Sequence, residues 1–137
     1  MKPWTLPVYN QSKLACLMFA LELQRRSEAA AWRVTSIAAH PGNSRTDLLP
    51  NGAGKNSAQG LARKLLWFLF QPAAQGALPT LFAATSPDAQ PGAYYGPTRL
   101  GETRGPVGIA KIPRKALDRA TAARLWAVSE ELTGFVF

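Results

Sequence analysis

The hydrophobic positions between residues 11 and 26 predict the strongest helix of the chain. One face follows the i, i+3, i+4, i+7 spacing of a helix and is made of Leu14, Leu17, Met18 and Leu21. The opposite face is apolar too, because Cys16 is the only polar side chain between Leu14 and Leu21. Such a helix is expected to be buried on two sides, against a sheet and against another element or subunit. We expect Cys16 to pack in this core, and Glu22, Arg25 and Arg26 to mark the solvated end.

Residues 34–39 are short, β-branched and weakly alternating, which predicts a buried parallel strand. The strand should end in a turn at Pro41-Gly42. A helix followed by a strand and a Pro-Gly loop corresponds to the second half of a βαβ unit, and no first strand precedes it here.

The rest of the pattern predicts three more helices and one more strand. The expected elements are a loop over 43–56, a helix over 58–70 that Gln71-Pro72 ends, a helix over 74–85 that Pro79 kinks or restricts, a strand over 93–95, a loop over 96–113, and a last helix that Asp118 caps and Gly134 ends. The order is therefore α-β-α-α-β-α. A sheet of two strands is marginal on its own.

Composition places the chain among globular proteins of one domain. It has 137 residues, 47% of them hydrophobic and 18% charged, which argues against a disordered chain. The single cysteine cannot form an internal disulfide, and with the single histidine, His40, it forms no metal site without carboxylates. No signal-type leader and no run of eighteen apolar residues are found, so a cytoplasmic location is expected, without a transmembrane segment.

The net charge of +8 allows nucleic acid, an anionic membrane surface or an anionic cofactor as a partner. The basic residues are scattered, without interleaved aromatics and without a zinc-finger or RNA-recognition signature. We therefore expect no nucleic-acid partner. A basic binder of nucleic acid or membrane surfaces stays open as an alternative function.

Tyr9 and Lys13 stand four residues apart, on one face of the first helix. A tyrosine is ordinarily a weak acid at neutral pH, and a neighbouring ammonium stabilises its phenolate form. Such a pair could move a proton to or from a substrate oxygen. An aromatic at a helix start with a solvated lysine one turn on has the same spacing, so the spacing alone leaves both interpretations open.

Several further segments resemble one enzyme family. Tyr9-Asn10-Gln11-Ser12-Lys13 fits the Tyr-x-x-x-Lys signature of the short-chain dehydrogenase/reductase family, including its common serine before the lysine. "LACLMFALELQRR" resembles the helix after the catalytic tyrosine, and "VTSIAAHPGNSRTDL" resembles the next strand and Pro-Gly loop. "QGALPTLFAATSPDAQPGAYYGP" and "ARLWAVSEELTG" resemble the branch with retinol dehydrogenase-like and WW-domain oxidoreductase-like enzymes. The resemblance runs from about residue 8 to residue 134.

The resemblance implies an α/β fold, the helix-rich C-terminal part of a Rossmann-type doubly wound parallel sheet. It also implies NAD(P)-dependent interconversion of an alcohol and a carbonyl. Tyr9 would be the catalytic acid/base and Lys13 would assist it and bind the nicotinamide ribose. Pro41, Gly42 and Asn43 would line the nicotinamide pocket, and Thr46 would contact the carboxamide or a phosphate. His40, before the Pro-Gly turn, would be structural.

The implied organisation is one partial domain over 1–137. Residues 8–42 would form the catalytic helix, strand and Pro-Gly loop, residues 43–72 the substrate-binding loop and helix, and residues 73–137 the C-terminal helices, short strand and tail. The apolar character of the second segment suggests a lipophilic alcohol or ketone.

The chain also departs from the family pattern. The Gly-rich turn, the residue that selects NAD or NADP, the Asn-Ala-Gly region and the catalytic serine all precede the tyrosine in the family and are not found here. We therefore expect a truncated product, with Met1 an internal methionine of a longer enzyme, that lacks the N-terminal dinucleotide-binding half and is inactive alone. The alternative is a non-catalytic interaction module that forms a homo-oligomer through helix 11–26.

Overall fold

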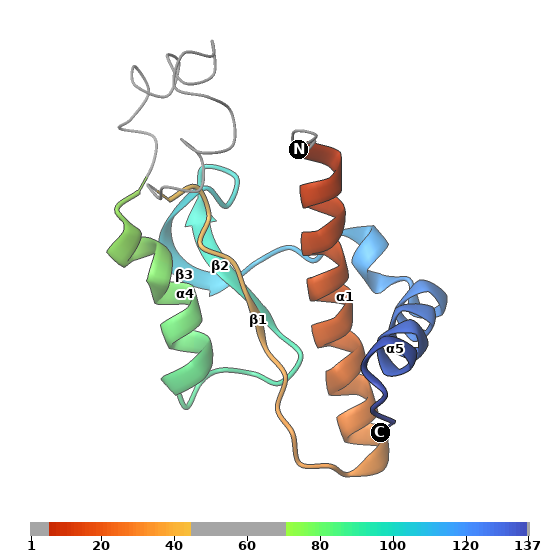
Figure 1. The fold of residues 1–137 in the computed structure, drawn as a ribbon. Helices are drawn as coiled ribbons and strands as arrows, with labels where there is room; N and C mark the ends of the chain where they lie inside the picture. The colour runs from red at the N-terminus through yellow and green to blue at the C-terminus, as the bar shows by residue number, and fades with distance from the viewer. Residues whose placement is uncertain (1–5, 45–70, 137) are drawn as a thin grey trace.

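The computed structural model describes residues 6–44 and 71–136, which form three layers (Figure 1). A small sheet lies between helix α4 on one side and helices α1 and α5 on the other. The elements are α1 (Leu6–Ala30), β1 (Ala38–Ala39), α4 (Ala73–Thr85), β2 (Tyr94–Arg99), β3 (Arg104–Ile109), the 3-10 helix η2 (Arg114–Leu117) and α5 (Arg119–Thr133). The predicted α/β class is therefore confirmed.

Helix α1 is longer than the predicted helix 11–26 at both ends. Pro7 is tolerated because it lies in the first turn, where backbone N–H groups have no partner within the helix. Leu17 and Met18 are buried against Ala116 and Ala122 of η2 and α5, and Ala38 packs against the same cluster from the sheet. The expected two-sided burial is confirmed, and both partners lie within the chain. Pairing of this helix with a second copy stays a prediction.

Two side-chain expectations for α1 were wrong. Cys16 is exposed, because Leu17 and Met18 take the buried positions of that turn. Glu22 is only 3% exposed, because two arginines of the next turn fold back over its carboxylate. Arg25 donates to it at 2.6 and 2.8 Å, and Arg26 donates from Nε at 2.7 Å. A charged residue that the pattern assigned to solvent is thus part of the buried face.

The predicted strand 34–39 pairs as a regular strand only at Ala38–Ala39, parallel to β2. Upstream, Ser36 is bound to helix α1. Its backbone N–H donates to Gln24 Oε1 at 2.8 Å and its hydroxyl donates to the carbonyl of Ala20 at 2.9 Å. These bonds fix the strand against α1, with the two running in opposite directions.

The expected loop 96–113 was wrong, since it contains most of an antiparallel hairpin formed by β2 and β3. The glycines that suggested turns are required by packing within the strands. A Cβ at Gly96 would overlap the His40 ring, and a Cβ at Gly108 would lie 2.5 Å from the side chain of Thr98. The sheet order is β1-β2-β3, so only its first pair is parallel.

The expectations for the C-terminal helices were accurate. Helix α4 runs through the buried Pro79 and differs from the predicted range by one residue. Asp118 caps α5 by accepting from the backbone N–H groups of Ala120 and Thr121 at 3.0 and 3.2 Å. Gly134 ends the helix in the left-handed region, at φ 72°. The predicted helix 58–70 lies outside the described residues.

One edge of β1 is open within residues 6–44 and 71–136. The N–H groups of Ala38 and His40 bond to the β2 side, so those of Ile37 and Ala39 point to the opposite side. A groove of about 560 Å³ runs along this side between the strand and helix α4, where Ala83 is part of its lining. Among the described helices, none has both the length and the apolar character needed to span a membrane.

Candidate functional site

Tyr9 and Lys13 lie together in the first turns of α1. The Nζ of Lys13 is 5.6 Å from the centre of the Tyr9 ring, which is a cation–π distance. The Tyr9 side chain is 38% exposed, and Lys13 is exposed as well. The hydroxyl of Ser12 donates to the Tyr9 carbonyl at 2.8 Å, so it is tied to the helix backbone. The phenol and the ammonium are therefore both open to a ligand at this end of the helix.

The turn after β1 is held by hydrogen bonds on several sides. The Pro41 carbonyl accepts from Gln71 Nε2 at 2.6 Å and from the Ser44 hydroxyl at 2.9 Å. The N–H of Asn43 donates to the carbonyl of Thr103 at 2.7 Å, which ties the turn to the β2–β3 hairpin. The backbone of residues 41–44 therefore forms a rigid turn.

Gly42 is the position in this turn where no other residue fits easily. Its φ is 61°, and a Cβ there would lie 2.5 Å from the Thr103 carbonyl oxygen and 2.6 Å from Pro97 Cγ. The backbone of the turn can therefore approach the hairpin only without a side chain at this position.

Gln71 is a residue that sequence reasoning missed as part of the site. It is fully buried, and besides its bond to Pro41 its Oε1 accepts from Gly105 N–H at 3.4 Å and its backbone N–H donates to Asn43. The only signal was a glutamine before Pro72, which indicated no more than a helix end. Its partners are 30 and 34 residues away in the sequence.

His40 packs beneath the turn. Its Nδ1 accepts from the Gly42 N–H at 3.3 Å, and its ring lies 4.9 Å from that of Tyr94. Its Nε2 is buried without a hydrogen bond among the described residues, 3.8 Å from a Glu102 oxygen. Burial lowers the pKa of His40, and the Glu102 charge opposes this effect. Burial, assisted by Glu102, raises the pKa of Tyr94.

The Tyr9–Lys13 pair and the Pro41–Gly42 turn lie at the same end of the molecule. Ser36 is bonded to Ala20, and from there Tyr9 lies eleven residues back along α1, about 16 Å. Gly42 lies six residues onward along the antiparallel strand, about 20 Å in the same direction. Figure 1 shows the start of α1 and the segment that follows β1 at the upper end of the molecule. Thr46, the remaining predicted site residue, lies outside the described residues.

The donors and acceptors at this end suit one part of a nicotinamide dinucleotide. An ammonium and a phenol can bond ribose hydroxyls, and a rigid turn with a close-packed glycine can flank a flat ring. The described residues contain no glycine-rich turn that leads from a strand into a helix, so they provide no such cradle for the pyrophosphate. The fit is therefore to the nicotinamide end alone.

Comparisons with known proteins identify relatives of this chain. The chain is 34% identical over 125 residues to the short chain dehydrogenase/reductase dpchH of Colletotrichum higginsianum, covering 88% of this chain and 28% of the relative. It is 33% identical over 130 residues to mouse Retinol dehydrogenase 14, covering 93% of this chain and 36% of that relative. It is 36% identical over 129 residues to mouse Polyprenol dehydrogenase, covering 92% of this chain and 35% of that relative. The chain is related to short-chain dehydrogenases/reductases.

The relationship extends to a solved structure. A crystal structure of an uncharacterized protein from Mycobacterium paratuberculosis superposes with a TM-score of 0.69 at 36% identity, covering 95% of this chain and 40% of that one. A scan against models of protein families finds no match. The chain spans about a third of the length of the two mouse relatives and 28% of the fungal one. The similarity therefore concerns part of a short-chain dehydrogenase/reductase fold, as the sequence blocks predicted.

Proposed function

We propose that this chain supplies the proton-transfer part of an NAD(P)-dependent oxidoreductase that interconverts an alcohol and a carbonyl. The observation that carries the proposal is the Tyr9–Lys13 pair, in contact at the open end of α1 and at the same level as the Pro41–Gly42 turn. The names of the relatives, all dehydrogenases or dehydrogenase/reductases, support it.

In this proposal the Tyr9 hydroxyl gives its proton to the carbonyl oxygen of the substrate during reduction and takes it back during oxidation. The Lys13 ammonium stabilises the phenolate that forms. Because both residues are on consecutive turns of one helix, their backbone positions are fixed relative to each other, and the Lys13 side chain can keep its ammonium beside the phenol when a ligand binds.

The cofactor would be NAD or NADP. Tyr9 and Lys13 would bond its nicotinamide ribose, and Thr46 would contact the carboxamide or a phosphate. Pro41, Gly42 and Asn43 would line the nicotinamide ring, which would supply or accept the hydride. The bonds from Gln71 and Thr103 hold the turn in place, so little ordering of the turn would be needed on binding. We propose that the chain alone does not turn over, because it spans only about a third of the mouse relatives.

The substrate would be lipophilic, bound by residues 43–72 between the catalytic segment 8–42 and the C-terminal segment 73–137. Two observations favour this class: the apolar composition of residues 61–70, and the names of relatives that act on retinol and polyprenol.

A chimeric enzyme tests the proposal. The 130 residues of mouse Retinol dehydrogenase 14 that match this chain are replaced by the corresponding residues of this chain, and retinol oxidation is followed with NAD and with NADP. We expect activity, and Tyr9→Phe should lower kcat at least about 100-fold. Tyr95→Phe is the matched control, since Tyr95 is buried on the α4 side of the sheet, and it should change kcat less than about threefold.

Two results would contradict the proposal. One is a folded chimera that binds cofactor but has no activity. The other is a Tyr9→Phe chimera as active as its parent. Turnover by the 137-residue chain alone would uphold the chemistry and overturn the proposed inactivity.

A further inference from the structure

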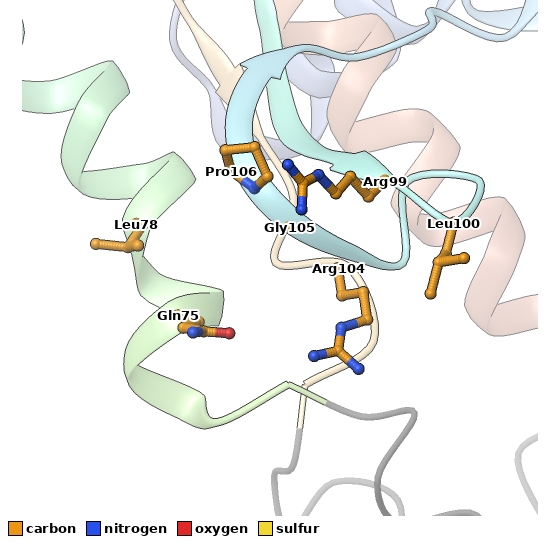
Figure 2. A pocket seen from close by; sticks show the side chains of 7 residues that line it. All are labelled: Gln75, Leu78, Arg99, Leu100, Arg104, Gly105 and Pro106. Atoms are coloured by element: carbon orange, nitrogen blue, oxygen red, sulfur yellow. The ribbon is translucent and has the colours of Figure 1, made fainter.

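We propose that a second site, separate from the Tyr9–Lys13 pair, binds an organic anion with a carboxylate or phosphate head and an apolar body. The site is a cavity of about 510 Å³ between the β2–β3 hairpin and the first half of α4, called the hairpin pocket below (Figure 2). Its polar lining is Gln75, Arg99 and Arg104, and its apolar lining is Leu78, Leu100 and Pro106. A cavity of this size is in the range of small-molecule sites.

The two arginines are directly opposite each other in the antiparallel ladder. Like charges at such a position destabilise a hairpin, because their Cβ atoms are only about 5 Å apart. Among the described residues, Arg99 makes no ion pair. An anion beside the Arg99 guanidinium would gain a charge-assisted contact there and would also lie in the field of the second positive charge, that of Arg104.

A β-bulge places the arginines at the pocket. The register changes from Pro97↔Val107 to Arg99↔Arg104, so β3 has one residue more than β2 in this interval. Gly105 is in the bulge with φ 114°, and a Cβ there would lie 2.9 Å from Arg99 Cβ and 3.0 Å from Arg99 Cγ. Only glycine lets the stem of Arg99 lie across the β3 backbone.

A hydrogen bond to the side chain of Gln71 fixes the bulge. The N–H of Gly105 donates to Oε1 of the fully buried Gln71, which the Pro41 carbonyl holds from the other side. The polar wall of the pocket therefore rests on a rigid part of the fold, which reduces the entropy lost when a ligand binds.

The opposite wall explains why the ligand needs an apolar body. Figure 2 shows Gln75 and Leu78 on α4 across the cavity from the hairpin. Leu78 is 44% exposed, and Leu100 at the hairpin tip is 67% exposed. A bare inorganic anion would leave these side chains in water, whereas an acyl or aryl body would cover them. The amide of Gln75 is a further donor for the head group.

The test is a titration of the 137-residue chain, followed by amide NMR, with octanoate, octyl phosphate, octanol and inorganic phosphate. Octanoate or octyl phosphate should bind at least about tenfold more tightly than octanol or inorganic phosphate, as expected when a charge-assisted bond and an apolar contact are both needed. Arg99→Gln and Arg104→Gln should each weaken binding about tenfold. Arg124→Gln on α5 removes the same charge away from the pocket and should change affinity less than twofold.

Other outcomes would overturn the site. Equal weakening by Arg124→Gln would mean attraction by net charge alone. If octanol binds as tightly as octanoate, the arginines have no role in binding. If inorganic phosphate binds as tightly as octyl phosphate, the site does not recognise an apolar body. Binding to anionic phospholipid vesicles without binding to octanoate would indicate a membrane surface as the partner. If an arginine variant fails to fold, the shifts of the unmutated chain decide: changes centred on Gly105 and Gln75 support the site, and changes elsewhere overturn it.

Discussion

His40 Nε2 lies 3.8 Å from the carboxylate of Glu102, and no other residue in the described part of the chain forms a hydrogen bond with this buried ring nitrogen. The contact joins the residue before the Pro-Gly turn to the tip of the β2–β3 hairpin. Its strength depends on the charge of the imidazole, and it therefore gives the fold a dependence on pH.

The free energy of unfolding should fall as the pH is lowered from 7 to 5. Burial lowers the pKa of His40 in the folded state, so the unfolded chain takes up the proton first, and acid favours unfolding below about pH 6.5. Glu102→Gln should make the fall steeper, because the charge that opposes the effect is lost. Urea unfolding at pH 7 and pH 5 measures this. A steeper fall in His40→Gln than in the parent would contradict it.

Glu22→Gln should lower the free energy of unfolding by about 1–2 kcal/mol at pH 7. The variant leaves two arginines without their buried negative charge and with one acceptor oxygen fewer, and the loss is moderated because both guanidinium groups reach solvent. Hydrogen bonds from Arg25, opposed by burial and assisted by Arg26, lower the pKa of Glu22 from 4.5 to about 2. The stabilisation is therefore present above pH 4.5 and lost as the pH falls toward 2.

Urea titrations between pH 7 and pH 2.5 would show that the difference in free energy of unfolding between the parent and the Glu22→Gln variant becomes smaller as the pH falls. Glu131→Gln is the matched control, since Glu131 is an exposed glutamate on α5 and should change stability by less than about 0.5 kcal/mol. Equal losses in the two variants would show that net charge, and not the contact with the arginines, is responsible.

Gln71→Ala should cost about 2–3 kcal/mol and loosen the Pro-Gly turn. The substitution leaves the Pro41 carbonyl with one partner fewer and the Gly105 N–H with no side-chain acceptor, and it removes a side chain that is fully buried. In the chimeric enzyme the KM for the cofactor should rise more than kcat falls. The control is Gln90→Ala, an exposed glutamine that should be neutral. Stability equal to that of the control would show that these bonds carry no net free energy.

Gly42→Ala should cost more than Gly101→Ala. Both glycines have positive φ values, 61° and 65°, so both alanines pay about 1 kcal/mol for the left-handed backbone. Only at Gly42 does the new Cβ also meet the Thr103 carbonyl and Pro97, whereas nothing lies within 4 Å at Gly101. The difference between the two variants in thermal or urea unfolding isolates the contact. Equal losses would mean that the turn moves away from the hairpin without cost.

Elements with local signals could be predicted from the sequence. The apolar stripe of α1, the Asp118 cap and the Gly134 stop depend on neighbours within a few residues, and the structure agrees with each. The contact of Tyr9 with Lys13 follows in the same way from their i, i+4 spacing. Their chemical roles stay predictions.

What the sequence could not show depends on residues far apart in the chain. Gly96 is a strand residue because the ring of His40 fills the space where a side chain would be, 56 positions earlier. Glu22 is buried because two arginines return to it, although its charge indicated solvent. Gln71 belongs to the site through bonds to Pro41 and Gly105 that no spacing rule reveals.

The exposed Cys16 has a practical consequence. It is the single cysteine of the chain, and it lies three residues after Lys13, on the same side of α1. A thiol-reactive fluorophore would therefore attach at one known position, without any engineered mutation, within one helical turn of the Tyr9–Lys13 pair. Its emission would report directly whether a nicotinamide nucleotide reaches that end of the helix.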